Sequence, residues 1–232
     1  CVTRIGVKWI RPQCTWLYGE ARRGDYDFLQ DSTLDKAREQ KVHVMMTLEY
    51  RPPDWARQLA GDTPLWPPPP VLLQAWSDYV TACVRRYDDM VDVWEIQNEP
   101  DLTCFYHVGI PEDMGVQSYV DIYRTAHAAI RAAGSTHPVA GVDVSGGDYR
   151  RNLAFSRAVL ARIADIVDIY TGHPYASPRY FGEGKSPLFP HENHLVEKLE
   201  NSRAMVAEYG GRPLWVGEKG WGLHISEPLG GP

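Results

Sequence analysis

The feature of this sequence that most constrains its fold is a repeated alternation of two patterns. Short runs of nearly continuous apolar residues are followed by longer stretches whose apolar residues recur every three or four positions. The apolar runs are residues 5–11, 42–50, 91–97, 139–144, 167–173 and 214–217. Such runs are typical of parallel strands covered on both faces, and the longer stretches are typical of amphipathic helices. A strand–helix alternation of this kind predicts a parallel sheet with right-handed crossovers.

Three of the longer stretches show the helical spacing clearly. In the first, successive apolar residues are four, three, four and four positions apart: Leu72, Trp76, Tyr79, Cys83 and Tyr87. The second steps by three and four throughout and is followed by Gly134, where a helix C-cap is expected: Val116, Tyr119, Tyr123, Ala126, Ile130 and Ala133. The third contains Leu195, Leu199, Met205 and Val206. These stretches predict helices between the strands.

The number of strands and the chain length favour one α/β domain over residues 1–232. An eight-stranded barrel needs about 250 residues, whereas this sequence has 232 residues and six strand-like runs. We therefore predict a (β/α)8 TIM barrel that is truncated at both ends, forming a partial catalytic domain. A six-stranded open sheet is the alternative. That alternative lacks the Gly-rich phosphate turn of nucleotide-binding sheets, because neither GxGxxG nor GxxxxGK[ST] occurs.

Composition excludes several classes of function. The net charge of −6, from 30 acidic and 24 basic side chains, argues against a nucleic acid partner, which selects clustered Lys and Arg. No apolar run approaches the roughly 18 residues of a membrane span. Cys1, Cys14, Cys83 and Cys104 form no CxxC pair, so a zinc site is not expected.

The cysteines leave two questions open. We place Cys14 and Cys104 in loops, where a disulfide between them has no support from the sequence, and Cys83 inside a helix as a small buried residue. Cys1 is the kind of residue that is acylated in bacterial lipoproteins, but a predicted strand follows almost at once, which favours a cut end. The compartment stays open: secreted or periplasmic is weakly favoured, and cytoplasmic is an alternative.

Polar residues follow the predicted strands at their carboxyl ends, where barrel enzymes carry their functional groups. They are Arg11, Glu49, Tyr50, Asn98, Glu99, Asp143, His173, Tyr175 and Glu218. Two of them, Glu99 and Glu218, are carboxylates that follow Trp-containing strands, 119 positions apart. Acetal hydrolysis needs one protonated and one ionised carboxyl group facing each other. The alternative for each is a solvated loop residue.

Two segments around these carboxylates resemble the acid/base and nucleophile strands of clan A retaining glycoside hydrolases. They read VWEIQNEPD at 93–101 and PLWVGEKGW at 213–221. Three more segments are similar to other strands of that clan: GVKWIRPQCTWLYGEARRGDYDF at 6–28, TLEYRPPDWA at 47–56 and GHPYA at 172–176. The resemblance is closest to family 39, the β-xylosidase and α-L-iduronidase branch. It implies that the chain covers roughly strands 2 to 7 of the barrel.

The resemblance also implies roles for individual residues. Glu99 would be the general acid/base and Glu218 the nucleophile in a double displacement on a plant or microbial glycan, with a xyloside-like sugar favoured. Asn98 would bind the sugar 2-hydroxyl, and Arg11 and Tyr175 would keep Glu218 ionised and oriented. His173 would line the site beside Glu99. No metal or organic cofactor is implied, and the partner is an oligosaccharide or glycoside substrate.

Two positions differ from the pattern of that branch: Gly217 stands where Thr or another small polar residue is common, and Gln97 stands where Trp is common. Other residues are assigned by their place in the pattern. We expect four tryptophans at the rim as candidates for stacking on sugars, namely Trp16, Trp55, Trp66 and Trp221, and four in the core, namely Trp9, Trp76, Trp94 and Trp215. Glu95 shares strand parity with Glu99 and is expected to be a polar residue inside the barrel.

Two rival interpretations come from other classes of protein. A carbohydrate-binding protein without turnover, or an inactive fragment of the enzyme, would keep the barrel and its aromatic residues. A metal-dependent hydrolase would need a cluster of His and Asp at the strand ends, which His173 and Asp143 alone do not supply. His191 and His194 have metal-like spacing, but they open an amphipathic stretch with no third ligand in the sequence, and we interpret them as solvated.

Overall fold

The computed structural model describes residues 6–63, 65–103, 111–145, 147–148, 151–175 and 194–218. Its strands form one parallel sheet with the order β1-β3-β4-β5-β6-β7, and β2 also pairs with β3. The strands are β1 (Trp9–Ile10), β2 (Gln13–Thr15), β3 (His43–Glu49), β4 (Val93–Ile96), β5 (Val139–Ser145), β6 (Ile169–His173) and β7 (Leu214–Val216). Every predicted run therefore holds a strand, and the first run continues into β2 after a break at Arg11 and Pro12. The predicted parallel α/β fold is confirmed.

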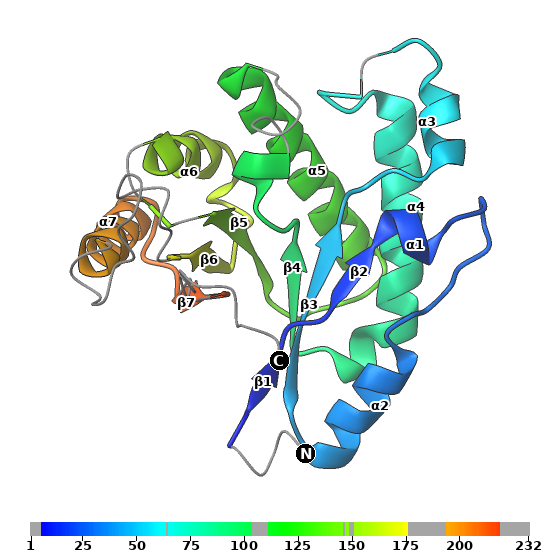
Figure 1. Ribbon diagram of the computed structural model, residues 1–232, viewed down its shortest axis with the longest axis horizontal. Helices are drawn as coiled ribbons and strands as arrows, with labels where there is room; N and C mark the ends of the chain where they lie inside the picture. The colour runs from blue at the N-terminus through cyan, green and yellow to red at the C-terminus, as the bar shows by residue number, and fades with distance from the viewer. Residues whose placement is uncertain are drawn as a thin grey trace, which may run out of the picture.

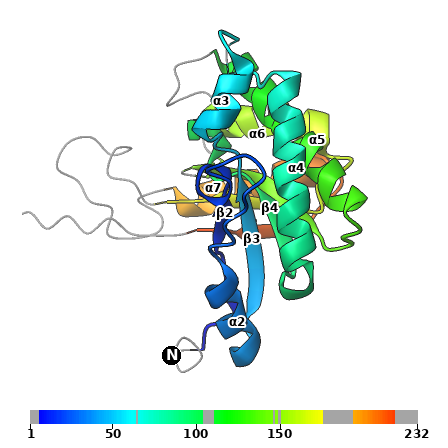
Figure 2. The same cartoon turned by 90° about the vertical axis from the view of Figure 1, so that its right-hand side faces the viewer.

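The helices lie outside the sheet (Figure 1). They are α1 (Trp16–Gly19), α2 (Asp31–Gln40), α3 (Asp54–Ala60), α4 (Pro70–Tyr87), α5 (Glu112–Ala132), α6 (Arg151–Ile163) and α7 (Leu195–Glu208), with a 3-10 turn η2 at Asp88–Met90. From the side, α4 runs along β3 and β4 and packs beside α5 (Figure 2). This arrangement covers the outer face of each central strand with apolar helix residues, as a barrel requires.

The sheet curves far enough to be part of a barrel. Its two end strands, β1 and β7, approach each other, and the ring centroids of Trp9 and Trp215 are 5.1 Å apart. On the inner side of this curve, Met45, Val93, Ala140 and Ile169 form a small apolar cluster of their own, separate from the large core under the helices. The fold is thus a partial (β/α)8 barrel, in agreement with the sequence.

The helices form where the apolar spacing predicts them. Pro70 occupies the first turn of α4, where its missing N–H costs no hydrogen bond, and all five residues of the predicted stripe from Leu72 to Tyr87 are buried. Gly134 follows α5 with φ of 98°, a conformation that favours glycine, and its N–H bonds the Arg131 carbonyl at 3.0 Å. Each fully buried large apolar side chain contributes about 1.5–3 kcal/mol to folding, so these stripes anchor the helices to the sheet.

Two assignments from the sequence are wrong. Trp9, expected in the core, is 40% exposed because β1 is an end strand of the described sheet, and its ring stacks on His43. Cys14, expected in a loop, lies in β2 and is buried with its Sγ 3.4 Å from Met46 Sδ. Cys104, its suggested partner, lies outside the described residues. Among the described helices, none is both long and apolar enough to cross a membrane.

Candidate active site

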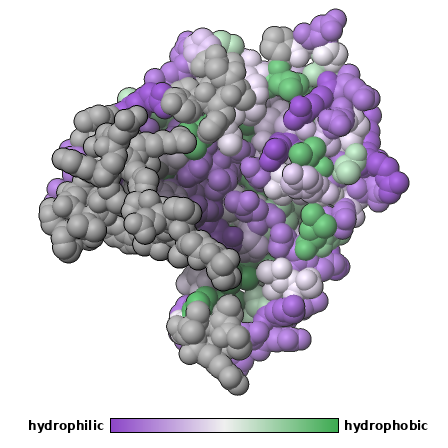
Figure 3. Space-filling model, viewed as in Figure 1, coloured by the Kyte–Doolittle hydropathy of each residue, from purple (hydrophilic) through white to green (hydrophobic). Residues whose placement is uncertain are grey.

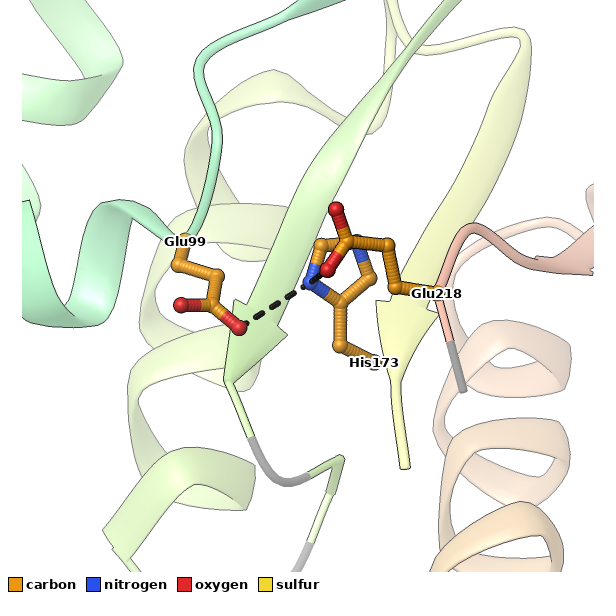
Figure 4. A group of neighbouring side chains, drawn as sticks. All are labelled: Glu99, His173 and Glu218. Carbon is orange, nitrogen blue, oxygen red and sulfur yellow. Dashed lines mark hydrogen bonds and ion pairs between the residues drawn. The ribbon is translucent and has the colours of Figure 1, made fainter. Parts of the chain in front are cut away.

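The carboxyl ends of β4, β6 and β7 bring Glu99, His173 and Glu218 together (Figure 4). His173 Nδ1 lies 3.1 Å from Glu99 Oε1 and 3.7 Å from Glu218 Oε2. One oxygen of each carboxylate and the imidazole nitrogen all lie within 4.8 Å of one another. The two glutamates, 119 positions apart in the sequence, therefore face each other at one edge of the sheet.

The backbone after β4 is bent sharply to present Glu99. Gln97 has φ of 69° and Glu99 has φ of 43°, and for residues other than glycine such conformations cost about 1–3 kcal/mol each. Hydrogen bonds hold the bend: Gln97 Oε1 accepts from the Tyr50 N–H at 2.8 Å, and its Nε2 donates to Thr103 Oγ1 at 2.9 Å. Gln97 is buried, so the residue that replaces the Trp of the related branch acts here as an anchor for the loop.

Arg11 connects the site to the barrel interior. Its guanidinium donates to Glu218 Oε1 at 2.9 Å and to Asn98 Oδ1 at 3.1 Å. Deeper in the barrel it pairs with Glu95 and Asp143, each at 2.6 Å. The Arg11 side chain is only 10% exposed, so these ionic contacts are shielded from water.

Tyr175 approaches Glu218 from the other side. Its hydroxyl donates to Glu218 Oε2 at 2.7 Å, and this bond, with burial second, raises the pKa of Tyr175 to about 12. Arg11 and Tyr175 thus each donate to one oxygen of Glu218, which fixes the plane of that carboxylate. The contacts implied by the resemblance for these two residues are present in the structure.

The buried charges around Arg11 shift one another's titration. Burial and the neighbouring Asp143 raise the pKa of Glu95 to about 7, against the opposing effect of Arg11. Burial lowers the pKa of His173, but its contacts with Asp143 and Glu99 outweigh burial and raise it to about 9. Glu95 is fully buried and also accepts from Thr47 Oγ1 at 2.7 Å, as expected of a polar residue inside the barrel.

These shifts predict that the protein loses stability as the pH rises. The pKa values of Asp101, Glu95 and His173 are about 6, 7 and 9 in the folded state, against ordinary values of 3.8, 4.5 and 6.5. Between the ordinary and the folded pKa value of each group, the folded state therefore binds more protons than the unfolded chain. The free energy of unfolding falls as the pH rises through each of these intervals. Urea denaturation at pH 5, 7 and 9 measures this slope.

Two substitutions serve as test and control for this pH dependence. Glu95→Gln should flatten the slope between pH 4.5 and 7, whereas Glu197→Gln, at an exposed position on α7, should leave it unchanged. An unfolding free energy that rises from pH 5 to pH 9 in the unmodified protein would contradict the assignment of these protons.

Asp143 is the residue whose importance the sequence analysis missed. It appears among the strand-end residues but was given no role. The structure buries it completely between Arg11 and His173, with its Oδ1 2.7 Å from His173 Nε2. The signal in the sequence was a charged residue flanked by Val142 and Val144 in an otherwise apolar strand, which is costly unless the charge is paired.

The tryptophans expected at the rim differ in burial. Trp16 is wrong as a stacking candidate: it is fully buried where the chain enters α1, among Tyr50, Trp55, Trp76 and Tyr79. Trp55 and Trp66 are half-buried. Trp221 and His191 lie outside the described residues, and His194 is an exposed residue paired with Glu197 at 2.9 Å.

Several hollows of the described residues border the site, two of which matter here, and the face seen in Figure 3 is recessed over a hydrophilic area near its centre. One hollow, of about 460 Å³, lies beside the ends of β3 and β4 and is lined in part by Glu49, Arg51, Trp66 and Gln97. The other, of about 420 Å³, opens between β1 and β7 next to Arg11. The first is large enough to hold a sugar ring and has both polar groups and an aromatic ring to contact one.

Within the described residues, Glu99, His173 and Glu218 are the one group of three acidic or histidine side chains close enough to share a metal ion. The Arg11 guanidinium, 2.9 Å from Glu218, places a positive charge beside the same oxygens. That positive charge disfavours a metal cation at these carboxylates.

No protein-family model and no curated protein sequence matches the chain. Among solved structures it is similar to a β-glycosidase (TM-score 0.70, 15% identity, 97% of this chain and 66% of that chain). It is also similar to a β-glucosidase from Exiguobacterium marinum (0.65, 18%, 95% and 66%) and to a family 39 glycoside hydrolase from the gut symbiont Bacteroides cellulosilyticus WH2 (0.61, 19%, 95% and 45%). The chain spans just under two thirds of the first two and less than half of the third. Its fold is the partial barrel that these glycoside hydrolases contain.

Proposed function

We propose that this chain carries the catalytic residues of a retaining glycoside hydrolase of clan A, within a partial barrel domain over residues 1–232. The approach of Glu99 and Glu218, with one oxygen of each within 4.8 Å, is the observation that carries the proposal. The carboxyl groups of retaining enzymes are about 5–5.5 Å apart and those of inverting enzymes about 6.5–9.5 Å apart, because the latter admit a water between substrate and base. An approach of one oxygen of each carboxylate within 4.8 Å is compatible with the retaining range, and we infer double displacement, as the resemblance implies.

The surroundings of the two carboxylates support different roles. Glu218 is held in one orientation by hydrogen bonds from Arg11 and Tyr175, as a nucleophile requires. Glu99 has the imidazole of His173 as its partner, at 3.1 Å, and follows Asn98 after the end of β4. We assign it the role of general acid/base, as the resemblance implies.

In the proposed reaction, Glu218 attacks the anomeric carbon while Glu99 gives its proton to the departing glycosidic oxygen. A covalent glycosyl–Glu218 ester forms, and the aglycone leaves. Glu99, now ionised, takes a proton from water, which attacks the same carbon and releases the sugar with its original configuration. Both steps use only side chains of this chain, so EDTA should leave the turnover unchanged.

The substrate class is inferred from the residues around Glu99 and from the resemblance. Asn98, next to Glu99, accepts from Arg11 through its Oδ1, and we assign it the sugar 2-hydroxyl, as the resemblance implies. The hollow beside β3 and β4 borders the Glu99 loop through Gln97 and Thr103, so it would receive the leaving group. We favour a xyloside-like glycan; the names of the similar structures add glucoside, galactan and mannoside as further candidates.

The proposal is tested by release of nitrophenol from a panel of aryl glycosides: β-xyloside, β-glucoside, β-galactoside, β-mannoside and α-arabinofuranoside. Turnover on at least one of them, unchanged by EDTA, is expected. If the folded protein binds oligosaccharides in calorimetry but hydrolyses neither these compounds nor soluble xylan, the carbohydrate-binding interpretation replaces this one.

A further inference from the structure

The middle of β5 is distorted in a way that turns Asp143 into the barrel. The register between β5 and β6 shifts between Val142 and Val144, which marks a bulge. Val142 has φ of 81° and Asp143 has φ of 42°, both in the left-handed region that residues other than glycine avoid. A β-branched residue in this region is a marked outlier, and such strain persists only where surrounding contacts enforce it.

The contacts that enforce it are ionic and fully buried. Asp143 Oδ2 lies 2.6 Å from the Arg11 guanidinium, and Asp143 Oδ1 lies 2.7 Å from His173 Nε2. The side chains of Asp143 and His173 are both 0% exposed. The other nitrogen of the imidazole, Nδ1, faces Glu99. Asp143 therefore reaches the candidate acid/base through one histidine.

Gly217, which directly follows β7, leaves room for the contact between Asp143 and His173. A Cβ atom added at Gly217 would lie 3.0 Å from His173 Nε2 and 3.1 Å from Asp143 Oδ1, at the very contact between them. The small polar residue common at this position in the related branch would press on both atoms. The glycine and the bulge are thus two separate features of the chain that make the same contact possible.

Among the described residues, the titratable groups that face His173 and Asp143 come from several strands. From β4 and its loop come Glu95 and Glu99; from the ends of β1, β6 and β7 come Arg11, Tyr175 and Glu218. Of the carboxylates, Asp143 and Glu99 lie nearest the imidazole, at 2.7 Å from Nε2 and 3.1 Å from Nδ1.

We propose that Asp143 is a positioning residue that keeps His173 in its doubly protonated form and, through it, directs the acid proton of Glu99 toward the substrate. This inference rests on the proposed glycosidase function. With both ring nitrogens protonated, Nδ1–H donates to Glu99 Oε1, so the carboxyl proton must sit on Oε2, from which it passes to the departing oxygen. A neutral imidazole with its proton on Nε2 would instead accept the Glu99 proton at Nδ1 and compete with the substrate.

The first test measures the His173 imidazole by NMR titration, with its signals assigned by comparison with His173→Gln. The unmodified protein should show a pKa of about 9. Asp143→Asn should lower the pKa of His173 below that of the unmodified protein, because the larger of the two carboxylate contacts that offset burial is lost and Glu99 alone remains. Asp148→Asn, which removes a buried carboxylate bonded to Tyr170, Ser156 and Ser202, should leave the pKa of His173 near 9.

The second test measures kcat and KM on glycosides with good and poor leaving groups. Asp143→Asn should lower kcat on poor leaving groups about 100-fold, within the range of one general acid, with little change in KM and a smaller loss on activated aryl glycosides. Gly217→Ala, which pushes the two side chains apart without changing charge, should lower both the His173 pKa and kcat in the same direction. If Asp143→Asn does not fold, Gly217→Ala tests the same positioning role.

The outcomes separate this inference from the proposed function. An active enzyme whose Asp143→Asn and Gly217→Ala variants keep the pKa of His173 or lose activity equally on all leaving groups would overturn the positioning role alone. A protein with the expected NMR shifts but no activity on any glycoside would overturn the proposed function, and with it the catalytic part of this inference.

Discussion

Glu218→Gln is expected to lower kcat/KM on the best aryl glycoside by roughly 10⁴-fold or more. Loss of a nucleophile removes the covalent route entirely, and losses of this order follow removal of nucleophiles in other enzymes. Glutamine keeps the size of the side chain and one acceptor for Arg11 or Tyr175, so the fold should be retained. Initial rates at saturating and limiting substrate measure the loss.

The matched control for this variant is Glu20→Gln. Glu20, like Glu218, accepts hydrogen bonds at both carboxylate oxygens, here from Trp16 Nε1 and the Gly24 N–H, but it is buried at the end of α1, away from the strand ends that carry the site. Its substitution should cost stability without a large loss of kcat. Equal losses in Glu20→Gln and Glu218→Gln would show that the Glu218 effect comes from misfolding. A Glu218→Gln variant that keeps a tenth of the activity would exclude Glu218 as nucleophile.

Glu99→Gln is expected to have the second largest effect, and its size should depend on the leaving group. On glycosides with poor leaving groups, loss of the acid should lower kcat/KM by about 10²–10⁴-fold. On dinitrophenyl glycosides, whose leaving group needs no proton, the first step should be nearly unchanged. The intermediate should then accumulate, because Glu99 also activates the water of the second step.

A burst of dinitrophenol followed by slow turnover is therefore the expected time course for Glu99→Gln. Added azide, a nucleophile that needs no general base, should restore turnover by attacking the glycosyl enzyme. A uniform loss on good and poor leaving groups, with no burst and no effect of azide, would contradict the acid/base assignment.

The sequence predicts most of this fold because the strands are buried on both faces. Runs such as 139–144 and 167–173 are mostly apolar, with single polar residues such as Asp143 and Asp168, so their composition still indicates buried strands. The stripe of α4 is similarly unambiguous. The errors fall on residues next to the ends of the sheet: Trp9 has no strand beyond it among the described residues, and Cys14 lies in a three-residue strand after a break. Local pattern does not reveal what packs on an end strand.

The site was predictable where function depends on short motifs and unpredictable where it depends on backbone distortion. Glu99, His173, Tyr175 and Glu218 follow strands within recognisable segments, and the structure brings all four together. The inward turn of Asp143 depends on a bulge in β5, which no spacing in the sequence encodes. Trp16 was misplaced because a four-residue helix, too short for a periodic signal, carries it into the core.

Trapping of the covalent intermediate tests the central claim most directly. A dinitrophenyl 2-deoxy-2-fluoro glycoside of the sugar preferred in the aryl panel slows release of the enzyme from its ester, since the fluorine destabilises the second transition state. Mass spectrometry of the digested protein should then find one fluoroglycosyl group per chain, on the peptide that contains Glu218, and none in Glu218→Gln. A label on Glu99 or on another residue, or turnover of the parent glycoside with no label at all, would contradict the account.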